Sequence, residues 1–141
     1  MLNPMALTDS ELSISDDPRV VDFHQLLQLQ QEASWARDRS ILDLHRAIVS
    51  SDLVITAWQG ELLVGCVRIL SDFIYRAVLC DVIVHPDFRG RGVGTLLVQT
   101  ATEHPRLARV SKFTLLTTSA RAFYERLGWK RYPGEGMVYE R

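Results

Sequence analysis

The chain has 141 residues, of which 47% are hydrophobic and 23% are charged, and its formal net charge is −1. This length suits one domain with its own core, and the near-neutral charge argues against the domain-wide basic bias of nucleic-acid-binding proteins. No apolar run approaches the ~20 residues that span a membrane, and residues 1–10 lack a signal-peptide pattern, so we expect a cytoplasmic protein. The two cysteines, Cys66 and Cys80, show no metal-ligand spacing, so we expect neither a disulfide nor a metal.

Two helices are predicted in the first third of the chain. Residues 1–17 are polar and expected to be loosely ordered, although residues 11–15 could form a short edge strand. Apolar spacing after Pro18 predicts a first helix that runs to about residue 30. A second helix is predicted from residue 41 to residue 49, because its apolar residues recur at helical spacing and Ser40 can cap it.

The apolar period then changes to that of strands. Residues 53–58, 62–70 and 75–84 are apolar, partly β-branched runs. They are separated by turn signals, Gln59-Gly60 and Ser71-Asp72. We therefore predict an antiparallel meander over residues 53–84.

The last third alternates helices and strands. A helix is predicted from Val93, then a short buried strand over residues 113–117, then a helix capped by Ser119 and stopped by Gly128. Terminal strands are predicted over residues 129–131 and 137–140. The order of elements indicates a mixed α+β fold, with one mostly antiparallel sheet and about four helices in a single domain over residues 18–141.

A glycine-rich turn follows the third strand of the meander. The strand ends at Val84, and Arg89-Gly90-Arg91-Gly92-Val93-Gly94 leads into the next helix. Glycines let backbone N–H groups approach a ligand closely, and the start of a helix favours anions such as phosphate. The spacing matches neither a Walker loop nor a dinucleotide-binding loop, and taken alone it could be a simple helix entry.

Two motifs together resemble a known family. Arg89-x-x-Gly92-x-Gly94, after a strand that runs into Val84-His85-Pro86, is similar to the acetyl-CoA motif of the GCN5-related N-acetyltransferase (GNAT) family. Residues 122–129, Ala-Phe-Tyr-Glu-Arg-Leu-Gly-Trp, resemble the second hallmark of that family, with Trp129 in place of the usual Phe. The resemblance covers roughly residues 18–141 and implies the GNAT-type fold, a twisted central sheet flanked by helices.

Shorter stretches narrow the resemblance to one branch. Residues 35–40, 71–72, 81–86 and 136–139 look like the cyanobacterial and plastid-type branch. Plant members of that branch are known as serotonin (arylalkylamine) N-acetyltransferases and also as protein acetyltransferases.

The resemblance implies acetyl-CoA as the acetyl donor. The strand residues would pair with the pantetheine arm, the glycine turn would hold the pyrophosphate, and the two arginines would add positive charge. The expected donor-binding residues are Val82, Ile83, Val84, Arg89, Gly90, Arg91, Gly92, Val93, Gly94 and Thr95.

Direct attack of an amine on the thioester requires an acid and a base. Tyr124 matches the family tyrosine near the thioester sulfur, and a phenol is protonated at pH 7, so we expect it to donate a proton to the leaving thiolate. Asp81, a carboxylate inside an apolar strand, is a candidate base, although a salt bridge would also explain it. Asp72 could bind a cationic amine, and Trp35 and Phe73 could stack on an aromatic one, or these two rings could belong to the core.

Three functions follow from these residues. The first is acetylation of a small primary amine, preferably an alkylamine or arylalkylamine. The second is acetylation of protein lysines or N-termini, and the third is an acetyl-CoA-binding sensor without catalysis, against which Tyr124 argues. We expect a small-molecule or protein amine as partner, no nucleic acid and no membrane. Many members of the family pair through edge or C-terminal strands, which makes a homodimer an expectation as well.

Overall fold

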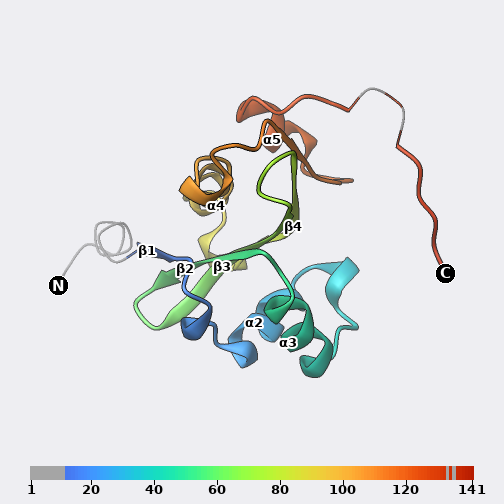
Figure 1. Ribbon diagram of the computed structural model, residues 1–141. Coiled ribbons are helices and arrows are strands. Elements are labelled where there is room, and N and C mark those ends of the chain that lie inside the picture. Colours follow the sequence, from blue (N-terminus) through green and yellow to red (C-terminus); the bar gives the residue numbers. More distant parts are fainter. Residues whose placement is uncertain (1–11, 133, 135) are drawn as a thin grey trace.

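The computed structural model describes residues 12–132, 134 and 136–141 (Figure 1). The described residues form one five-stranded sheet in the order β1-β2-β3-β4-β5, with every pair of neighbours antiparallel except β4 and β5. The strands are β1 (Leu12–Ser15), β2 (Leu53–Gln59), β3 (Leu62–Ser71), β4 (Arg76–Val84) and β5 (Lys112–Thr114). The α-helices in the described part of the chain are α2 (Phe23–Gln30), α3 (Ile41–Val49), α4 (Val93–Thr102) and α5 (Arg121–Arg126). The predicted α+β fold is confirmed.

The meander β2-β3-β4 forms where the sequence predicts it. The turn between β2 and β3 uses Gly60 at a φ of 58°, a conformation that glycine adopts without steric cost. The predicted edge strand is also confirmed for residues 12–15, which pair with β2. The remainder of the segment expected to be loosely ordered, residues 1–11, lies outside the described residues.

Side-chain caps set the starts of the first two described helices. Residues 18–20 form a short 3-10 turn, and α2 begins only at Phe23 because the Asp22 carboxylate accepts the N–H groups of His24 and Gln25. For α3 the predicted cap is confirmed, since Ser40 Oγ accepts the N–H of Asp43 at 3.1 Å.

The sheet carries helices on both faces (Figure 1). On one face α4 packs on β2 and β3, with Ile55, Val67 and Leu97 fully buried between them. On the other face Leu26 of α2 and Leu44 of α3 pack against the sheet. Burial on both faces explains why the three meander strands read as almost continuous apolar runs.

Three predictions for the C-terminal third are wrong. The strand expected over residues 113–117 is shorter, Lys112–Thr114. Ser119 does not cap α5; instead Thr117 Oγ1 accepts the N–H of Ala120 at 3.0 Å. The described residues of the predicted terminal strands, 129–131 and 137–140, form no strand, because none of them pairs with the sheet. The last residues run away from α5 (Figure 1), and Tyr139 is 86% exposed.

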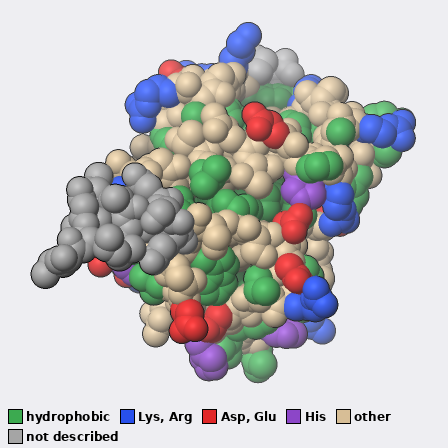
Figure 2. Space-filling view, turned by 90° about the vertical axis from the view of Figure 1, so that its left-hand side faces the viewer, with side chains coloured by type: hydrophobic (Ala, Val, Ile, Leu, Met, Phe, Trp, Pro, Cys, Tyr) green, Lys and Arg blue, Asp and Glu red, His purple; other side chains and the backbone are tan. Residues whose placement is uncertain are grey.

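The described surface carries both signs of charge. On the face that Figure 2 shows, Lys and Arg side chains are interspersed with Asp and Glu. Helix α4, with 10 residues, is the longest in the described part of the chain, and no helix there could cross a membrane. The expected cytoplasmic location and the expected absence of nucleic acid stay predictions.

Candidate active site

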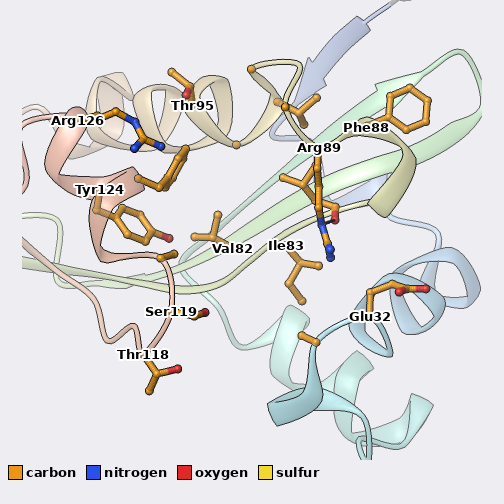
Figure 3. Close-up of a pocket in the computed structure, with 18 of the residues that line it drawn as sticks. Glu32, Val82, Ile83, Phe88, Arg89, Thr95, Thr118, Ser119, Tyr124 and Arg126 are labelled. Atoms are coloured by element: carbon orange, nitrogen blue, oxygen red, sulfur yellow. Dashed lines mark hydrogen bonds between the residues drawn. The ribbon is translucent and has the colours of Figure 1, made fainter.

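The sheet opens between β4 and β5. Strand β5 pairs with β4 only from Arg76 to Val78, whereas β3 stays paired with β4 as far as Val84. Beyond Val78, the β4 edge that faces β5 therefore has no ladder partner among the described strands. A cleft of about 770 Å³ lies along this edge, which is within the usual range for small-molecule sites (Figure 3).

Most of the predicted site residues line this cleft. They come from β4, the glycine turn, the start of α4, helix α5 and the segment after α2. The lining includes Trp35, Val82, Ile83, Val84, Arg89, Gly90, Gly92, Val93, Gly94, Thr95 and Tyr124. The structure therefore brings together residues that are up to 89 positions apart in the sequence, the separation between Trp35 and Tyr124.

A bulge in β4 borders the cleft. Cys66 pairs with Ile83 and Arg68 pairs with Cys80, so one residue of β3 lies opposite both Asp81 and Val82. Asp81 adopts a φ of 56°, which is uncommon for a residue other than glycine. Such a bulge bends a strand and re-aims the side chains beside it.

The glycine turn gives α4 an open start. Gly92 caps the helix at a φ of 84°. The first backbone hydrogen bond of the helix is donated by the Leu96 N–H to the Gly92 carbonyl at 3.0 Å. The N–H groups before Leu96 therefore have no acceptor within the helix and lie at its positive end, beside the cleft. A Cβ on Gly94 would lie 3.2 Å from Phe123 Cζ, so this position allows α5 to approach α4 closely. These features fit phosphate oxygens.

The two predicted arginines differ in position. Arg89 lines the cleft and donates its Nε–H to the Val84 carbonyl at 3.3 Å (Figure 3). Arg91 is not part of the lining; its Cζ lies 5.3 Å from the ring centroid of Phe88, which does line it.

Tyr124 is held by other aromatic rings. Its ring centroid lies 4.9 Å from that of Phe123 and 5.8 Å from that of Trp129, both edge-on, and Tyr124 is only 8% exposed. In Figure 3 its hydroxyl extends toward Val82. Burial raises the pKa of Tyr124, so the phenol stays protonated at neutral pH.

Asp81 lies beside the cleft and not among its lining residues. Its side chain is 5% exposed and forms salt bridges with Arg39 and Arg68. Burial alone would raise the pKa of Asp81, but the hydrogen bonds and charges of Arg39 and Arg68 outweigh it, and the pKa lies below its ordinary value. A carboxylate in this state is a weak base. The sequence offered a salt bridge as the alternative explanation of Asp81, and the structure contains it. The catalytic role of Asp81 stays a prediction.

Two of the three predicted substrate residues lie far from the cleft. Asp72 and Phe73 precede β4, and at ~3.3 Å per strand residue they are roughly 20 Å from Val82. Asp72 accepts three backbone N–H groups within its own turn, and Phe73 lies under Arg106, whose Cζ is 4.6 Å from the ring centroid. Trp35, by contrast, lines the cleft and is 57% exposed.

Other residues that line the cleft were not predicted as site residues, among them Glu32, Thr118, Ser119 and Arg126. Arg126 lies inside the second motif, and its position there is a signal that could have been used. Ser119 was assigned to a helix cap instead. Glu32 follows α2 and carries no sequence signal, because only the fold brings the end of that helix to β4. The described residues contain no group of three potential metal ligands.

Comparisons with known proteins agree with this geometry. The family model described as acetyltransferase (GNAT) family matches residues 20–129. The N-acetyltransferase ycf52 of Pyropia yezoensis, whose name marks it as uncharacterized, is 30% identical, with 84% of this chain and 72% of that protein aligned. The histone acetyltransferase TAP1 of Glycine max is 27% identical, over 83% of this chain and 55% of that protein. A crystal structure of a candidate GNAT acetyltransferase from Xanthomonas campestris pv. campestris is 31% identical and superposes with a TM-score of 0.81 over 92% of both chains.

Proposed function

The chain belongs to the acetyltransferase (GNAT) family, and we propose that it transfers an acetyl group from acetyl-CoA to a primary amine, preferably a small alkylamine or arylalkylamine. The observation that carries this proposal is the open edge of β4, which leads directly into the glycine-capped start of α4 and faces the Tyr124 phenol. One ligand with both an amide-bearing arm and phosphates would satisfy both features.

The cleft suits the donor in two places. Along Val82, Ile83 and Val84, the edge of β4 that faces away from β3 has no ladder partner among the described strands, so backbone groups on that side can bind the amides of the pantetheine arm, as an added strand would. The Val84 carbonyl also accepts the Arg89 Nε–H. The start of α4 offers backbone N–H groups to the pyrophosphate, with Arg89 and Arg126 adding positive charge nearby. Arg91 would contribute charge from a greater distance.

Acetyl-CoA supplies an acetyl group on a thioester, and transfer forms a C–N bond to the amine while the C–S bond breaks, the amine loses a proton and the thiolate gains one. Tyr124 is placed to donate the second proton, since its phenol is protonated and faces the cleft. Its burial between Phe123 and Trp129 fixes the ring, so the hydroxyl needs no reorganisation to act.

The acceptor would enter from the side of the segment after α2. Glu32 is the one carboxylate among the described residues that line the cleft, so it can attract an ammonium group and take up its proton through water. Trp35 offers an exposed aromatic face to an apolar substituent. A cationic amine with an aromatic body fits both.

Calorimetric titration of acetyl-CoA, followed by a thiol-release assay over tryptamine, serotonin and polyamines, tests the proposal. We expect micromolar binding and release of CoA with at least one amine class. A Glu32→Gln variant should raise the KM for the amine and leave donor binding unchanged. Absence of donor binding, or binding without release on any amine, would contradict the small-amine function.

One comparison favours a second acceptor class. The soybean relative is named a histone acetyltransferase, and an open cleft can admit a lysine side chain as well as a free amine. Acetylated peptides detected by mass spectrometry, without turnover of any small amine, would establish this function instead. Binding of acetyl-CoA with no transfer to amines or peptides would favour the sensor. The expected homodimer stays a prediction that sedimentation can test.

A further inference from the structure

One buried carboxylate connects β4 to the segment that carries Trp35. Arg39 Nη1 donates to Asp81 Oδ2 at 2.7 Å and Arg39 Nη2 donates to Asp81 Oδ1 at 3.2 Å, a two-point contact. Arg68 of β3 donates its Nε–H to Oδ2 at 3.0 Å. The Asp81 side chain is 5% exposed, so water competes little for these bonds.

Arg39 in turn contacts two other parts of the structure. Its Nη1 also donates to Gln30 Oε1, at the buried end of α2, at 2.7 Å. Its Cζ lies 5.3 Å from the centroid of the Trp35 ring. A planar guanidinium stacked on an indole restricts the orientation of the ring. Trp35 is otherwise 57% exposed, so this contact is a main restraint on its side chain.

The position of Asp81 makes this contact relevant to the cleft. Asp81 occupies the bulge in β4, and the next residue, Val82, begins the stretch of β4 that lines the cleft. Trp35 lines the cleft from the segment after α2. The Arg39–Asp81 ion pair therefore links these two parts of the lining.

We propose that Arg39 and Asp81 are positioning residues of the acceptor site, in which Asp81 holds Arg39 and Arg39 holds the Trp35 ring toward β4, so that the pair determines which amines fit. This role rests on the proposed function of the cleft. Asp81 stays charged throughout and takes no proton from the amine, in contrast to the role of base that the sequence suggested.

The first test measures the Trp35 ring without any turnover. Acrylamide quenching is compared in the wild type, Arg39→Met and Asp81→Asn, and the contribution of Trp35 is isolated with Trp35→Phe counterparts, since the chain has 3 tryptophans. Met keeps an unbranched, flexible side chain without the guanidinium, and Asn tolerates positive φ. We expect faster quenching of Trp35 in both variants. Unchanged quenching in a folded Arg39→Met variant would overturn the proposal, even if Asp81→Asn fails to fold.

The second test is a double-mutant cycle on amine kinetics. Arg39→Met should raise the KM for the amine about two- to fivefold, the size expected for one cation–π contact, with little change in kcat. In a Trp35→Ala background the same substitution should have no further effect. Additive effects would contradict positioning through Trp35. Loss of kcat in Asp81→Asn together with loss of the acidic limb of the pH profile would identify Asp81 as the base instead.

Arg37 provides the matched control on the same segment. Its Nε–H donates to the Gln31 carbonyl at 3.1 Å, and it is exposed. Arg37→Met should leave quenching and kinetics unchanged. If the wild type releases no CoA with any amine, the proposed function fails, while the quenching comparison still decides whether Arg39 and Asp81 hold Trp35.

Discussion

The two ends of β4 carry similar residues and have different structures. Before the strand, Asp72 stands next to Phe73, which has a φ of 63°; near its end, Asp81 itself has a φ of 56°. Both carboxylates have a pKa below the ordinary value. Only the second end borders the cleft.

The two carboxylates also differ in their partners. Asp72 accepts the backbone N–H groups of Ile74, Tyr75 and Arg76, so the turn before β4 satisfies itself. Asp81 instead binds Arg39 and Arg68, 42 and 13 residues away in sequence. The backbone of β4 is occupied by β5 at the first end, from Arg76 to Val78, and has no such partner among the described strands near Asp81. The Asp81 carboxylate instead connects this open end to α2 and β3 through Arg39 and Arg68.

The largest expected effect is on catalysis at the open end. Tyr124→Phe should lower kcat by about 10²- to 10⁴-fold, because it removes the proposed proton donor while keeping the ring. Calorimetry should show unchanged acetyl-CoA binding. Tyr75→Phe, before β4 and 73% exposed, is the matched control and should leave kcat as it is. If the kcat of Tyr124→Phe were within tenfold of the wild-type value, Tyr124 would not be the proton donor.

The second largest effect is on stability. Asp81→Ala should lower the free energy of unfolding by about 3 kcal/mol, because it leaves two partly buried guanidinium groups without their counter-charge. Urea titration measures this loss. Asp72→Ala should cost less, since its carboxylate is solvent-exposed and water can replace it on the N–H groups. A larger loss for Asp72→Ala would reverse the comparison between the two ends.

Local signals in the sequence predicted much of the fold. Ser40 caps α3 by accepting the N–H of Asp43, three positions along the chain. Gly128 follows the end of α5 and has a φ of 90°. Gly92 likewise takes the left-handed conformation at the start of α4. Each of these features depends on a few neighbouring residues, so spacing and residue type suffice to find it.

What the sequence could not predict depends on distant contacts. Nothing near Asp81 indicates that Arg39 lies beside it, and the bulge that displaces Asp81 appears only when β3 and β4 pair. The sequence suggests Asp72 as a ligand for a cationic amine, because no local signal shows at which end of the sheet its turn lies. The strand predicted at residues 137–140 has an apolar pattern, but a strand also requires a partner.

The contribution of Asp81 should depend on pH. Since its pKa in the folded protein lies below the ordinary value of 3.8, its stabilisation is fully present above about pH 4 and is lost as the pH falls through the folded value. The difference in unfolding free energy between the wild type and Asp81→Asn should therefore shrink when urea titrations at pH 7 are repeated near pH 3. A difference that stays constant over this range would show that the charge of Asp81 contributes nothing.

A smaller effect is expected at the glycine turn. Gly92→Ala should cost about 1 kcal/mol, because a side chain is strained at a φ of 84°, although nothing lies within 4 Å of the new Cβ. It should also weaken acetyl-CoA binding, since the Cβ would occupy space near the start of α4. Gly136→Ala, which also has open space and no positive φ, is the control. Equal effects of the two substitutions on donor binding would argue against a phosphate site at Gly92.

The smallest effect concerns thiol reactivity on either side of the bulge. Burial raises the pKa of Cys66 to about 12, so hardly any thiolate forms at pH 8. Cys80 is only partly buried, and burial raises its pKa as well. Ellman's reagent should label one thiol slowly and the other only after unfolding, and Cys80→Ser should abolish labelling of the folded protein. Rapid labelling of two thiols would show that the bulge region opens.

Hydrogen–deuterium exchange with and without acetyl-CoA tests the central claim most directly, because it compares the two ends of β4 in one experiment. The structure predicts slower exchange of backbone amides over residues 82–84 and 92–95 when the donor binds, with no change over residues 72–78. Protection at residues 72–78, or bound donor without protection at residues 82–95, would contradict the assignment of the open end of β4 as the acetyl-CoA site.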